Sequence, residues 1–351
     1  MSMIKMLNPL AAVWLCSVIS LAAGCESETG TGGGGAGAAG GSGGEGGSGE
    51  GGAQAEQGTR MFVLSLNSGV ASFSNAEEAN GSDASKTLLN AGPDSGMYGP
   101  RDLELDAAGT LYVASENDGS VVMYEQAEQA SGMVTPSRRL AGASTGVVAP
   151  IALAIDRSSD ELYVVNSGSI GSVDTRIRVF AKGSTLDGEV APARTIEPEV
   201  EGFAPIGLTF AGGALYAVTQ TTNSTAVLVF EDVASADGLV APSRTVTHPD
   251  FGSAAAVHVT AEGKLVVVDE AASVFVFNAG EAEPSLVFEI EGASALNAAH
   301  GLENGALLFS DRSQNRVFAL DEGLPTAAGP IAPSRTIESE DILLPGALGS
   351  N

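Results

Sequence analysis

Short runs of consecutive apolar residues, separated by turn residues, recur from about residue 60 to the end of the chain. Three clear examples are residues 121–124, 227–230 and 274–277, which are rich in β-branched and aromatic side chains. Apolar and polar residues do not alternate within them, and such continuous runs are typical of strands buried on both faces. No part of this region shows the sustained period of an amphipathic helix. The pattern therefore predicts an all-β fold.

The apolar runs belong to a unit that repeats at intervals of roughly 50 residues. One segment of the unit resembles Leu-Tyr-Val and occurs at residues 61–63, 111–113, 162–164, 215–217, 265–267 and 307–309. The next segment ends on Phe73, Tyr124, Phe180, Phe230, Phe277 or Leu320. A third segment resembles Pro-x-Arg-Thr-Ile and occurs at residues 136–140, 192–196, 242–246 and 333–337, with degenerate copies at 85–88 and 284–287. A repeat of this length is typical of a four-stranded propeller blade.

The remaining segment of the unit resembles Pro-x-x-Leu and precedes the Leu-Tyr-Val segment. Its copies are expected at residues 100–103, 150–153, 205–208, 254–257, 299–302 and 345–348. The last copy lies at the C-terminus, and the N-terminal unit lacks one. We therefore predict a six-bladed β-propeller of four-stranded blades over residues 59–351, closed by the C-terminal strand joining the N-terminal blade. The alternative is a β-sandwich in which the phrases recur by coincidence.

The N-terminus has the pattern of an export signal. Lys5 precedes an apolar stretch from Leu10 to about Ala23, which is too short for a durable membrane span. Its end, Leu21-Ala22-Ala23-Gly24-Cys25, resembles the bacterial lipoprotein signal, in which the cysteine becomes diacylated and N-terminal. The resemblance implies a signal peptide over residues 1–24, lipidation of Cys25 and anchoring in the bacterial cell envelope, most simply at the outer membrane. Ordinary secretion with an incidental cysteine is the alternative.

Residues 25–58 are rich in glycine, with serine, alanine and glutamate between, and predict a disordered tether. The only cysteines are Cys16 and Cys25, so cleavage and acylation would leave no thiol in the mature domain. The tether joins the first strand at the end that in other units adjoins tight turns such as residues 106–110. We expect the opposite face, with longer loops at 115–120, 166–175 and 219–224, to meet a protein or glycan partner.

The formal net charge of −27 opposes electrostatic binding of nucleic acid. The chain has only 16 Lys and Arg residues. One repeat position, on the outermost strand, holds five of them: Lys86, Arg138, Arg194, Arg244 and Arg335. We expect this position to be structural, with the cations paired to acids such as Glu125, Glu231 and Asp232 at exposed sites.

Two rings of positions near the axis are candidates for chemistry, because some units depart from their own repeat toward polar residues. Near the inner strand these are Arg101, Asp102 and His300, with Glu104, His258 and Glu303 close by. After the Leu-Tyr-Val strand they include Asn166, Asp269 and Asp311. Arg101, Asp102, Asn166 and His300 form the candidate ligand rim. Glu104, Glu303, Asp269 and Asp311 are the metal candidates, with calcium as the possible ion, although no calcium-loop motif is present. No catalytic or cofactor-binding residue can be assigned.

The run of residues 150–156, followed by 162–164 and 177–180, resembles the NHL-type repeat of six-bladed propellers. This resemblance covers residues from about 60 to 351 and implies the same closed ring. The wider group includes interaction modules and also calcium-dependent lactonases of the gluconolactonase type. We therefore expect a lipid-anchored extracytoplasmic binding module. The alternatives are a metal-dependent hydrolase or lactonase and a structural spacer in the envelope.

Overall fold

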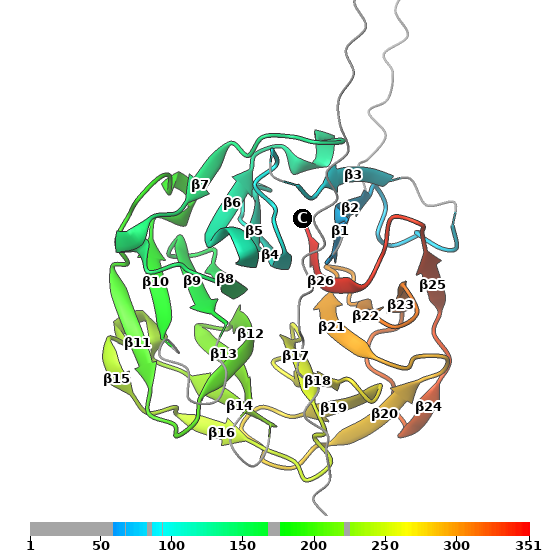
Figure 1. The fold of residues 1–351 in the computed structure, drawn as a ribbon. Coiled ribbons are helices and arrows are strands. Elements are labelled where there is room, and N and C mark those ends of the chain that lie inside the picture. Colours follow the sequence, from blue (N-terminus) through cyan, green and yellow to red (C-terminus); the bar gives the residue numbers. More distant parts are fainter. Residues whose placement is uncertain (1–58, 67, 83–85, 93, 168–175, 221–224) are drawn as a thin grey trace, which may run out of the picture. The chain divides into compact units, whose positions relative to one another are not determined.

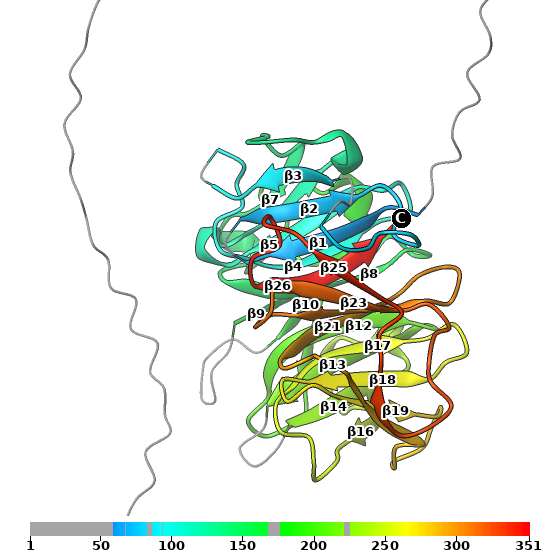
Figure 2. The same cartoon turned by 90° about the vertical axis from the view of Figure 1, so that its right-hand side faces the viewer.

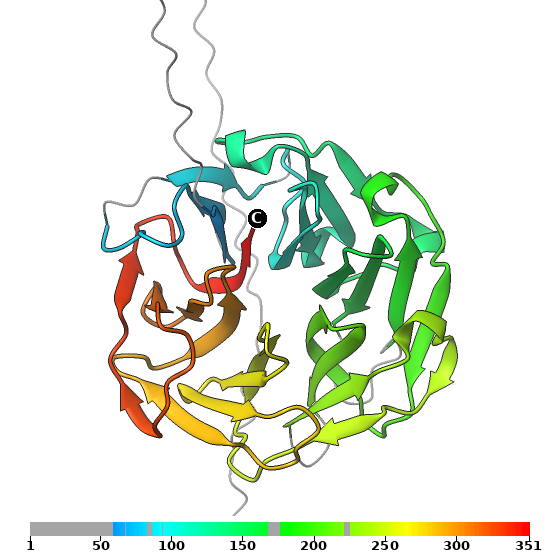
Figure 3. The ribbon, with the colours of Figure 1, turned by 180° about the vertical axis from the view of Figure 1, so that it is seen from behind.

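The computed structural model describes residues 59–351, except residues 67, 83–85, 93, 168–175 and 221–224. The predicted signal peptide, Cys25 and the tether lie outside the described residues. Within them, six separate sheets stand around a common axis, as Figure 1 shows along that axis and Figure 3 from behind. The predicted six-bladed β-propeller is confirmed.

Each blade has an inner strand at the axis, two middle strands and an outer strand, and we number the blades along the chain. Blade 1 contains β26 (Pro345–Ser350), β1 (Met61–Ser65), β2 (Gly69–Phe73) and β3 (Lys86–Asn90). Blade 2 contains β4 (Pro100–Leu105), β5 (Leu111–Ser115), β6 (Ser120–Tyr124) and β7 (Arg138–Leu140). Blade 3 contains β8 (Pro150–Asp156), β9 (Glu161–Asn166), β10 (Ile177–Ala181) and β11 (Arg194–Pro198).

The second half of the ring follows the same plan. Blade 4 contains β12 (Ala204–Ala211), β13 (Ala214–Gln220), β14 (Thr225–Phe230) and β16 (Arg244–Val246). Blade 5 contains β17 (Ala254–Val259), β18 (Leu265–Asp269), β19 (Ser273–Phe277) and β20 (Leu286–Ile290). Blade 6 contains β21 (Leu296–Gly301), β22 (Leu307–Asp311), β23 (Arg316–Leu320) and β25 (Arg335–Glu338).

The two ends of the propeller chain complete blade 1 together. β26 pairs antiparallel with β1, with Met61 opposite Ser350 and Val63 opposite Leu348. The backbone N–H of Arg60 also donates to Oδ1 of Asn351 at 3.0 Å. Figure 1 shows β26 beside β1 near the axis. The predicted closure is confirmed, and it gives the inner edge of the first blade a strand that the N-terminal repeat lacks.

The start of β1 lies on the face that carries the tight turns between inner and middle strands. β1 occupies the same place in its sheet as β5, which begins directly after the turn of residues 106–110. The first described residue, Thr59, therefore lies on the tight-turn face, which the side view of Figure 2 presents edge-on. The course of the tether beyond it lies outside the described residues.

Most residues of the middle strands are buried, as their continuous apolar runs predicted. Every residue of β1, β2, β5, β6, β18 and β22 is buried. Six apolar clusters result, and each combines residues of two neighbouring blades. The core of this protein is therefore a set of interfaces between blades, and each blade needs both neighbours to bury its faces.

One predicted strand was placed wrongly. The inner strand of blade 6 is Leu296–Gly301 instead of residues 299–302, because Leu296 pairs with Asp311 as Pro100 pairs with Ser115 in blade 2, and the same bulge follows in both blades. Ala299 occupies the position of Leu103, opposite Phe309, and Leu302 already belongs to the following turn. The Pro-x-x-Leu sequence is absent from this blade. Leu302, which resembles its leucine, lies three residues after the true equivalent, Ala299.

The outer strands carry additions that the repeat did not predict. β15 (Gly238–Val240) pairs in parallel with β11, and β24 (Gly329–Ile331) pairs in parallel with β20. Single parallel bridges join Leu89 to Gly132 and Leu140 to Gly188. In each case a connection from the following blade covers the exposed outer edge, which limits pairing with other chains.

The repeated arginine of the outer strand holds adjacent blades together. Arg194 Nη1 donates to the carbonyls of Val233 at 2.7 Å and Ala236 at 2.8 Å in blade 4. Its Nη2 pairs with Glu161 in its own blade at 2.6 Å, and both side chains are only 16% exposed. Arg138 pairs with Glu125 as predicted and reaches Gly183 and Leu186 of blade 3 in the same way. The structural role is supported, but these guanidinium groups are largely buried, whereas exposed pairs were expected.

Helical structure in the described part of the chain is limited to short 3-10 helices such as η3 (Ala143–Thr145), η4 (Gly183–Thr185) and η5 (Val233–Ser235). None of the described helices is long and apolar enough to cross a bilayer.

Candidate functional site

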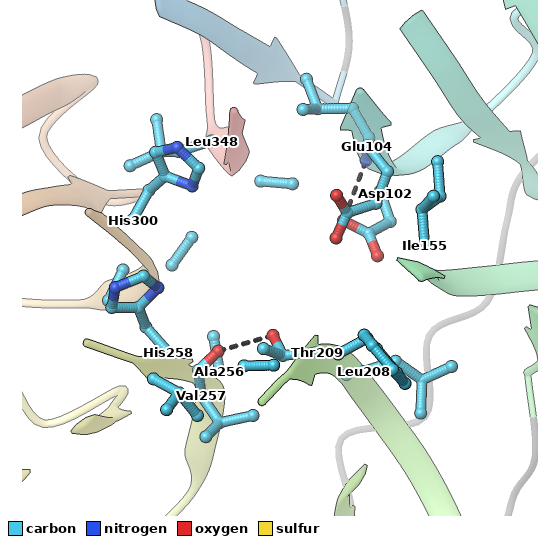
Figure 4. A pocket seen from close by; sticks show the side chains of 18 of the residues that line it. Asp102, Glu104, Ile155, Leu208, Thr209, Ala256, Val257, His258, His300 and Leu348 are labelled. Carbon is cyan, nitrogen blue, oxygen red and sulfur yellow. Dashed lines mark hydrogen bonds between the residues drawn. The ribbon is translucent and has the colours of Figure 1, made fainter. Parts of the chain in front are cut away.

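A cavity of about 550 Å³ occupies the axis of the ring. Residues of all six inner strands line it, from Arg101, Ile151 and Ile206 near the starts of their strands to the turns at 156–158 and 211–213. Most lining side chains are small or aliphatic, and Figure 4 shows the few polar groups that project into the open space. Its size is typical of a pocket for a small molecule.

Strand pairing defines which residues are equivalent around the axis. The fifth residue of the strand in blade 2, Glu104, lies opposite Tyr112, the second residue of β5. The equivalent residues in blades 2 to 6 and 1 are Glu104, Ala154, Thr209, His258, His300 and Gly349. His300 is therefore equivalent to Glu104 and His258, whereas the predicted alignment gave that position to Glu303. Because blades 2 and 5 are three apart in a ring of six, Glu104 lies across the axis from His258.

Two carboxyl groups project from β4. Asp102 and Glu104 are two residues apart, so their side chains leave the strand on the same side, and Figure 4 shows the carboxyl groups next to each other in the cavity. Asp102 Oδ2 accepts a hydrogen bond of 2.8 Å from the backbone N–H of Leu153 in blade 3, and Oδ1 accepts one of 2.9 Å from Leu103. Both side chains are partly accessible through the channel but enclosed by the ring.

Enclosure makes ionisation of this pair unfavourable. Burial raises the pKa of Asp102 to about 7, and the hydrogen bonds from Leu153 and Leu103 oppose that rise. Burial and then the nearby charge of Asp102 raise the pKa of Glu104 to about 8, while Arg157 and the Leu105 backbone oppose the rise. Near neutral pH the pair therefore retains a proton that free carboxyl groups would have lost.

Two imidazoles face the carboxyl groups from the other side of the cavity, as Figure 4 shows. The ring centroids of His258 and His300 are 6.0 Å apart. His300 Nε2 lies 2.8 Å from Ser350 Oγ on β26. Burial lowers the pKa of His258 to about 4, and burial together with His258 and Arg157 lowers the pKa of His300 to about 3. Both rings are therefore neutral at physiological pH, and each has one acceptor nitrogen. The acceptor of His300 is Nδ1 when its Nε2–H donates to Ser350.

Three further polar residues that line the cavity have hydrogen-bond or ion-pair partners. Thr209 Oγ1 donates to the carbonyl of Val257 at 2.9 Å. Arg157 Nε donates to the carbonyl of Leu105 at 3.0 Å, and Arg101 Nε pairs with Glu116 at 2.5 Å. Neither Asp102 nor Glu104 forms a salt bridge with a cation among the residues that the structure describes.

The predicted ligand rim is brought together in part. Arg101, Asp102 and His300 line the cavity. Asn166 is buried at the end of β9, where its Oδ1 accepts from Val148 at 3.1 Å and its Nδ2 donates to Gly146 at 2.9 Å. Asn166 therefore stabilises the loop that precedes β8, and it is not among the residues that line the cavity.

The four metal candidates do not meet. Glu104 lies in the cavity, and Glu303 lines a separate hollow beside the turn between β21 and β22 on the tight-turn face. Asp269 and Asp311 end β18 and β22 at the opposite face, where backbone N–H groups bind their carboxylates. Within the described residues, no three His, Cys, Asp or Glu side chains gather in a way that could hold a metal ion.

The hydrogen bonds of Asp311 show a structural role for the carboxylate at the end of β22. Its Oδ2 accepts from the backbone of Ser294 at 2.6 Å, and its Oδ1 accepts from Ser313 at 2.9 Å and Gln314 at 3.1 Å. Burial would raise the pKa of Asp311, but these hydrogen bonds outweigh it and the pKa is lowered. The carboxylate fixes the turn that follows β22.

Some features were not anticipated from the sequence. Thr209 could have been found, because it stands at the same repeat position as Glu104, but Arg157 follows its strand and carries no repeat signal.

The string Gly142-Ala143-Ser144-Thr145-Gly146 has the Gly-x-Ser-x-Gly pattern of a nucleophile elbow. It lies in η3, which follows the outer strand β7. A nucleophile elbow instead needs a sharp turn between a strand and an α-helix.

Comparisons with known proteins agree on the fold. A chain in the crystal structure of a nidogen/laminin complex matches with a TM-score of 0.56 and 13% identity, over 84% of this chain and 98% of that chain. A protein of unknown function from Bacteroides caccae matches with a TM-score of 0.56 and 10% identity, over the same shares. No family model matches the sequence. No curated protein matches it either. At these identities the similarity concerns the propeller fold and extends no further.

Proposed function

We propose that this protein is a binding module of the bacterial cell envelope, anchored through a lipid on Cys25, most simply at the outer membrane. The observation that carries the proposal is the axial cavity of about 550 Å³, in which polar side chains converge from blades 2, 5 and 6. The lipoprotein-like Leu21-Ala22-Ala23-Gly24-Cys25 sequence supports the anchoring. A binding role needs no catalytic set, and the propeller fold is consistent with an interaction module.

The binding part of the proposal can be tested by filling the cavity. Ala256 lies on β17 in the cavity wall, and Ala256→Phe would occupy part of the space. The matched control is Ala181→Phe at the last residue of β10, which is exposed. The mature, detergent-solubilised proteins would be incubated with small-molecule extracts of the cell envelope, and the retained compounds identified by mass spectrometry. We expect compounds retained by the wild type and the control but lost from Ala256→Phe. Equal retention by all three proteins would contradict the proposal.

The anchoring part has its own control in the chain. Cys25→Ser should abolish incorporation of a labelled fatty acid and release the protein from membranes, because the acylated thiol is gone. Cys16→Ser should leave both unchanged, because that residue lies in the predicted signal peptide. Labelled, membrane-bound Cys25→Ser protein would refute lipidation at this residue.

A further inference from the structure

The carboxyl groups and the imidazoles lie on different sides of the cavity, and this distribution restricts what the cavity can bind. Its charged and titratable groups are Arg101, Asp102 and Glu104 of blade 2, Asp156 and Arg157 at the end of β8, and His258 and His300 of blades 5 and 6. Blades 4 and 1 contribute uncharged residues to the wall. The two carboxyl groups therefore form one side, and two neutral imidazoles form the other.

Two arginines line the cavity near the carboxyl pair, but neither forms a salt bridge with it, although the charge of Arg157 acts against the raised pKa of Glu104. Arg101 Nε is bound to Glu116 at 2.5 Å, and Arg157 Nε is bound to the Leu105 carbonyl at 3.0 Å. Asp156 accepts from Ser158 and Ser159 and so belongs to its own turn. The enclosed pair of Asp102 and Glu104 thus lacks a salt-bridge partner among the described residues, and a bound positive charge would supply one.

From this arrangement we infer that the axial cavity binds a small aliphatic amine, with its ammonium group between Asp102 and Glu104 and a second donor directed to His258 or His300. The inference rests on the proposed function, because it names the ligand class of that cavity. An ammonium group offers three N–H donors to carboxylate oxygens. Ile155 and Leu208 line the cavity on the carboxyl side and offer apolar contacts to the hydrocarbon chain next to the ammonium group. A hard divalent cation fits less well, because calcium requires about six to eight oxygen ligands.

Proton release should accompany binding. The pKa values of Asp102 and Glu104 are raised to about 7 and about 8, so the pair holds a proton in the empty cavity near neutral pH. An ammonium ion favours the ionised carboxylates and displaces that proton. If binding releases one proton, the apparent affinity for the amine should rise by about tenfold for each unit of increase in pH, until the carboxyl groups are fully ionised.

The test is calorimetry on the mature, detergent-solubilised protein with 1,4-diaminobutane as the probe and 1,4-butanediol as its neutral counterpart. We expect the diamine to bind about tenfold or more tightly than the diol, and more tightly at about pH 8.5 than at about pH 6. Near neutral pH the measured heat should depend on the ionisation enthalpy of the buffer, because protons are released.

Two variants with the same change of net charge separate a site from general attraction to an acidic protein. Glu104→Gln should weaken diamine binding by about tenfold or more, whereas Glu283→Gln at an exposed surface position should not change it. Equal binding of the diol, no effect of Glu104→Gln, or binding independent of pH would overturn the inference. If neutral compounds are lost from Ala256→Phe while the diamine fails to bind, the binding function stands and the amine inference fails. If the cavity retains nothing at all, both fail.

Discussion

Arg335 Nη1 donates a hydrogen bond of 2.9 Å to the carbonyl of Ala76, which lies 259 positions earlier in the chain. It also donates to the carbonyl of Ala79 at 2.7 Å, while Nη2 pairs with Asp321 of blade 6 at 2.6 Å. The last repeat arginine thus joins blade 6 to blade 1 at the outer rim, just as Arg194 joins blade 3 to blade 4. The ring is closed twice, by β26 at the axis and by Arg335 at the rim.

Arg335→Ala should lower the free energy of unfolding by about 2–4 kcal/mol, because the carbonyls of Ala76 and Ala79 lose their charged donor and Asp321 loses its partner. Arg335→Lys should recover only part of this, since an ammonium group cannot reproduce the planar fork of a guanidinium. Urea unfolding measures both effects. The control is Arg312→Ala, which breaks the exposed pair with Glu270 at 2.8 Å and should cost less than about 1 kcal/mol. Similar losses at both arginines would contradict a special role for the repeat position.

Removal of residues 345–351 should abolish the cooperative unfolding of the domain. The truncation exposes the edge of β1 and the apolar cluster that contains Met61, Val63 and Leu348, and an uncovered edge strand favours aggregation. Size-exclusion chromatography and thermal unfolding would detect the change. Deletion of Asn351 alone, which removes mainly the bond from Arg60, should leave a soluble and cooperative protein. A soluble, cooperatively unfolding truncated protein would show that β26 is dispensable.

The carboxyl pair should make the protein less stable as the pH rises above about 6.5. The raised pKa values of about 7 and about 8 mean that folded Asp102 and Glu104 bind protons more tightly than the unfolded chain does, so stability falls with rising pH up to about 8. The lowered pKa values of His258 and His300 act in the opposite direction, but only below about 6.5. Above that pH, the carboxyl effect remains.

Glu104→Gln should therefore reduce the fall in stability between about pH 6.5 and pH 8.5. We expect a gain of about 1–3 kcal/mol at the higher pH, less than the full shift implies, because water entering the channel screens part of the charge. Thermal unfolding of wild type, Glu104→Gln and the surface variant Glu283→Gln at both pH values makes the comparison. If Glu104→Gln is no more stable than the wild type at the higher pH, ionisation of Glu104 in the cavity is not costly.

Asp311→Asn should destabilise the protein by about 1–2 kcal/mol, because the amide cannot accept all the backbone hydrogen bonds that the carboxylate receives. The loss should be the same in calcium and in EDTA, since these bonds require no metal. The control Asp250→Asn, at a side chain that is 80% exposed, should change stability by less than about 0.5 kcal/mol. A calcium-dependent thermal shift that disappears in Asp311→Asn would instead support a metal site at Asp311.

The candidate site was predictable only in part, for a reason visible in blade 6. Asp102 and His300 were recognised as departures from the repeat, yet Leu302 was mistaken for the apolar residue of the inner strand. The error shifted His300 by three positions and separated it from Glu104 and His258. Sequence similarity could not correct it, because Leu296 and Ala299 do not resemble the residues at these positions in the other inner strands. The register follows only from the pairing of Leu296 with Asp311. Asn166 illustrates the same limit of sequence reasoning, since its hydrogen bonds to Val148, Ala149 and Gly146 appear only in the folded structure.

By itself, the sequence determined the number of blades, the four-stranded plan of the blades and the closure by the last strand. These follow from local apolar runs and from a repeat whose first and last copies are incomplete, and both can be read along the chain. Only the tertiary structure decided which polar side chains share the axial cavity and which serve turns or neighbouring blades. Those assignments depend on strand register, including the bulge in each inner strand pair, and on which blades lie across the axis. Side chains from distant repeats become neighbours only when the ring has closed.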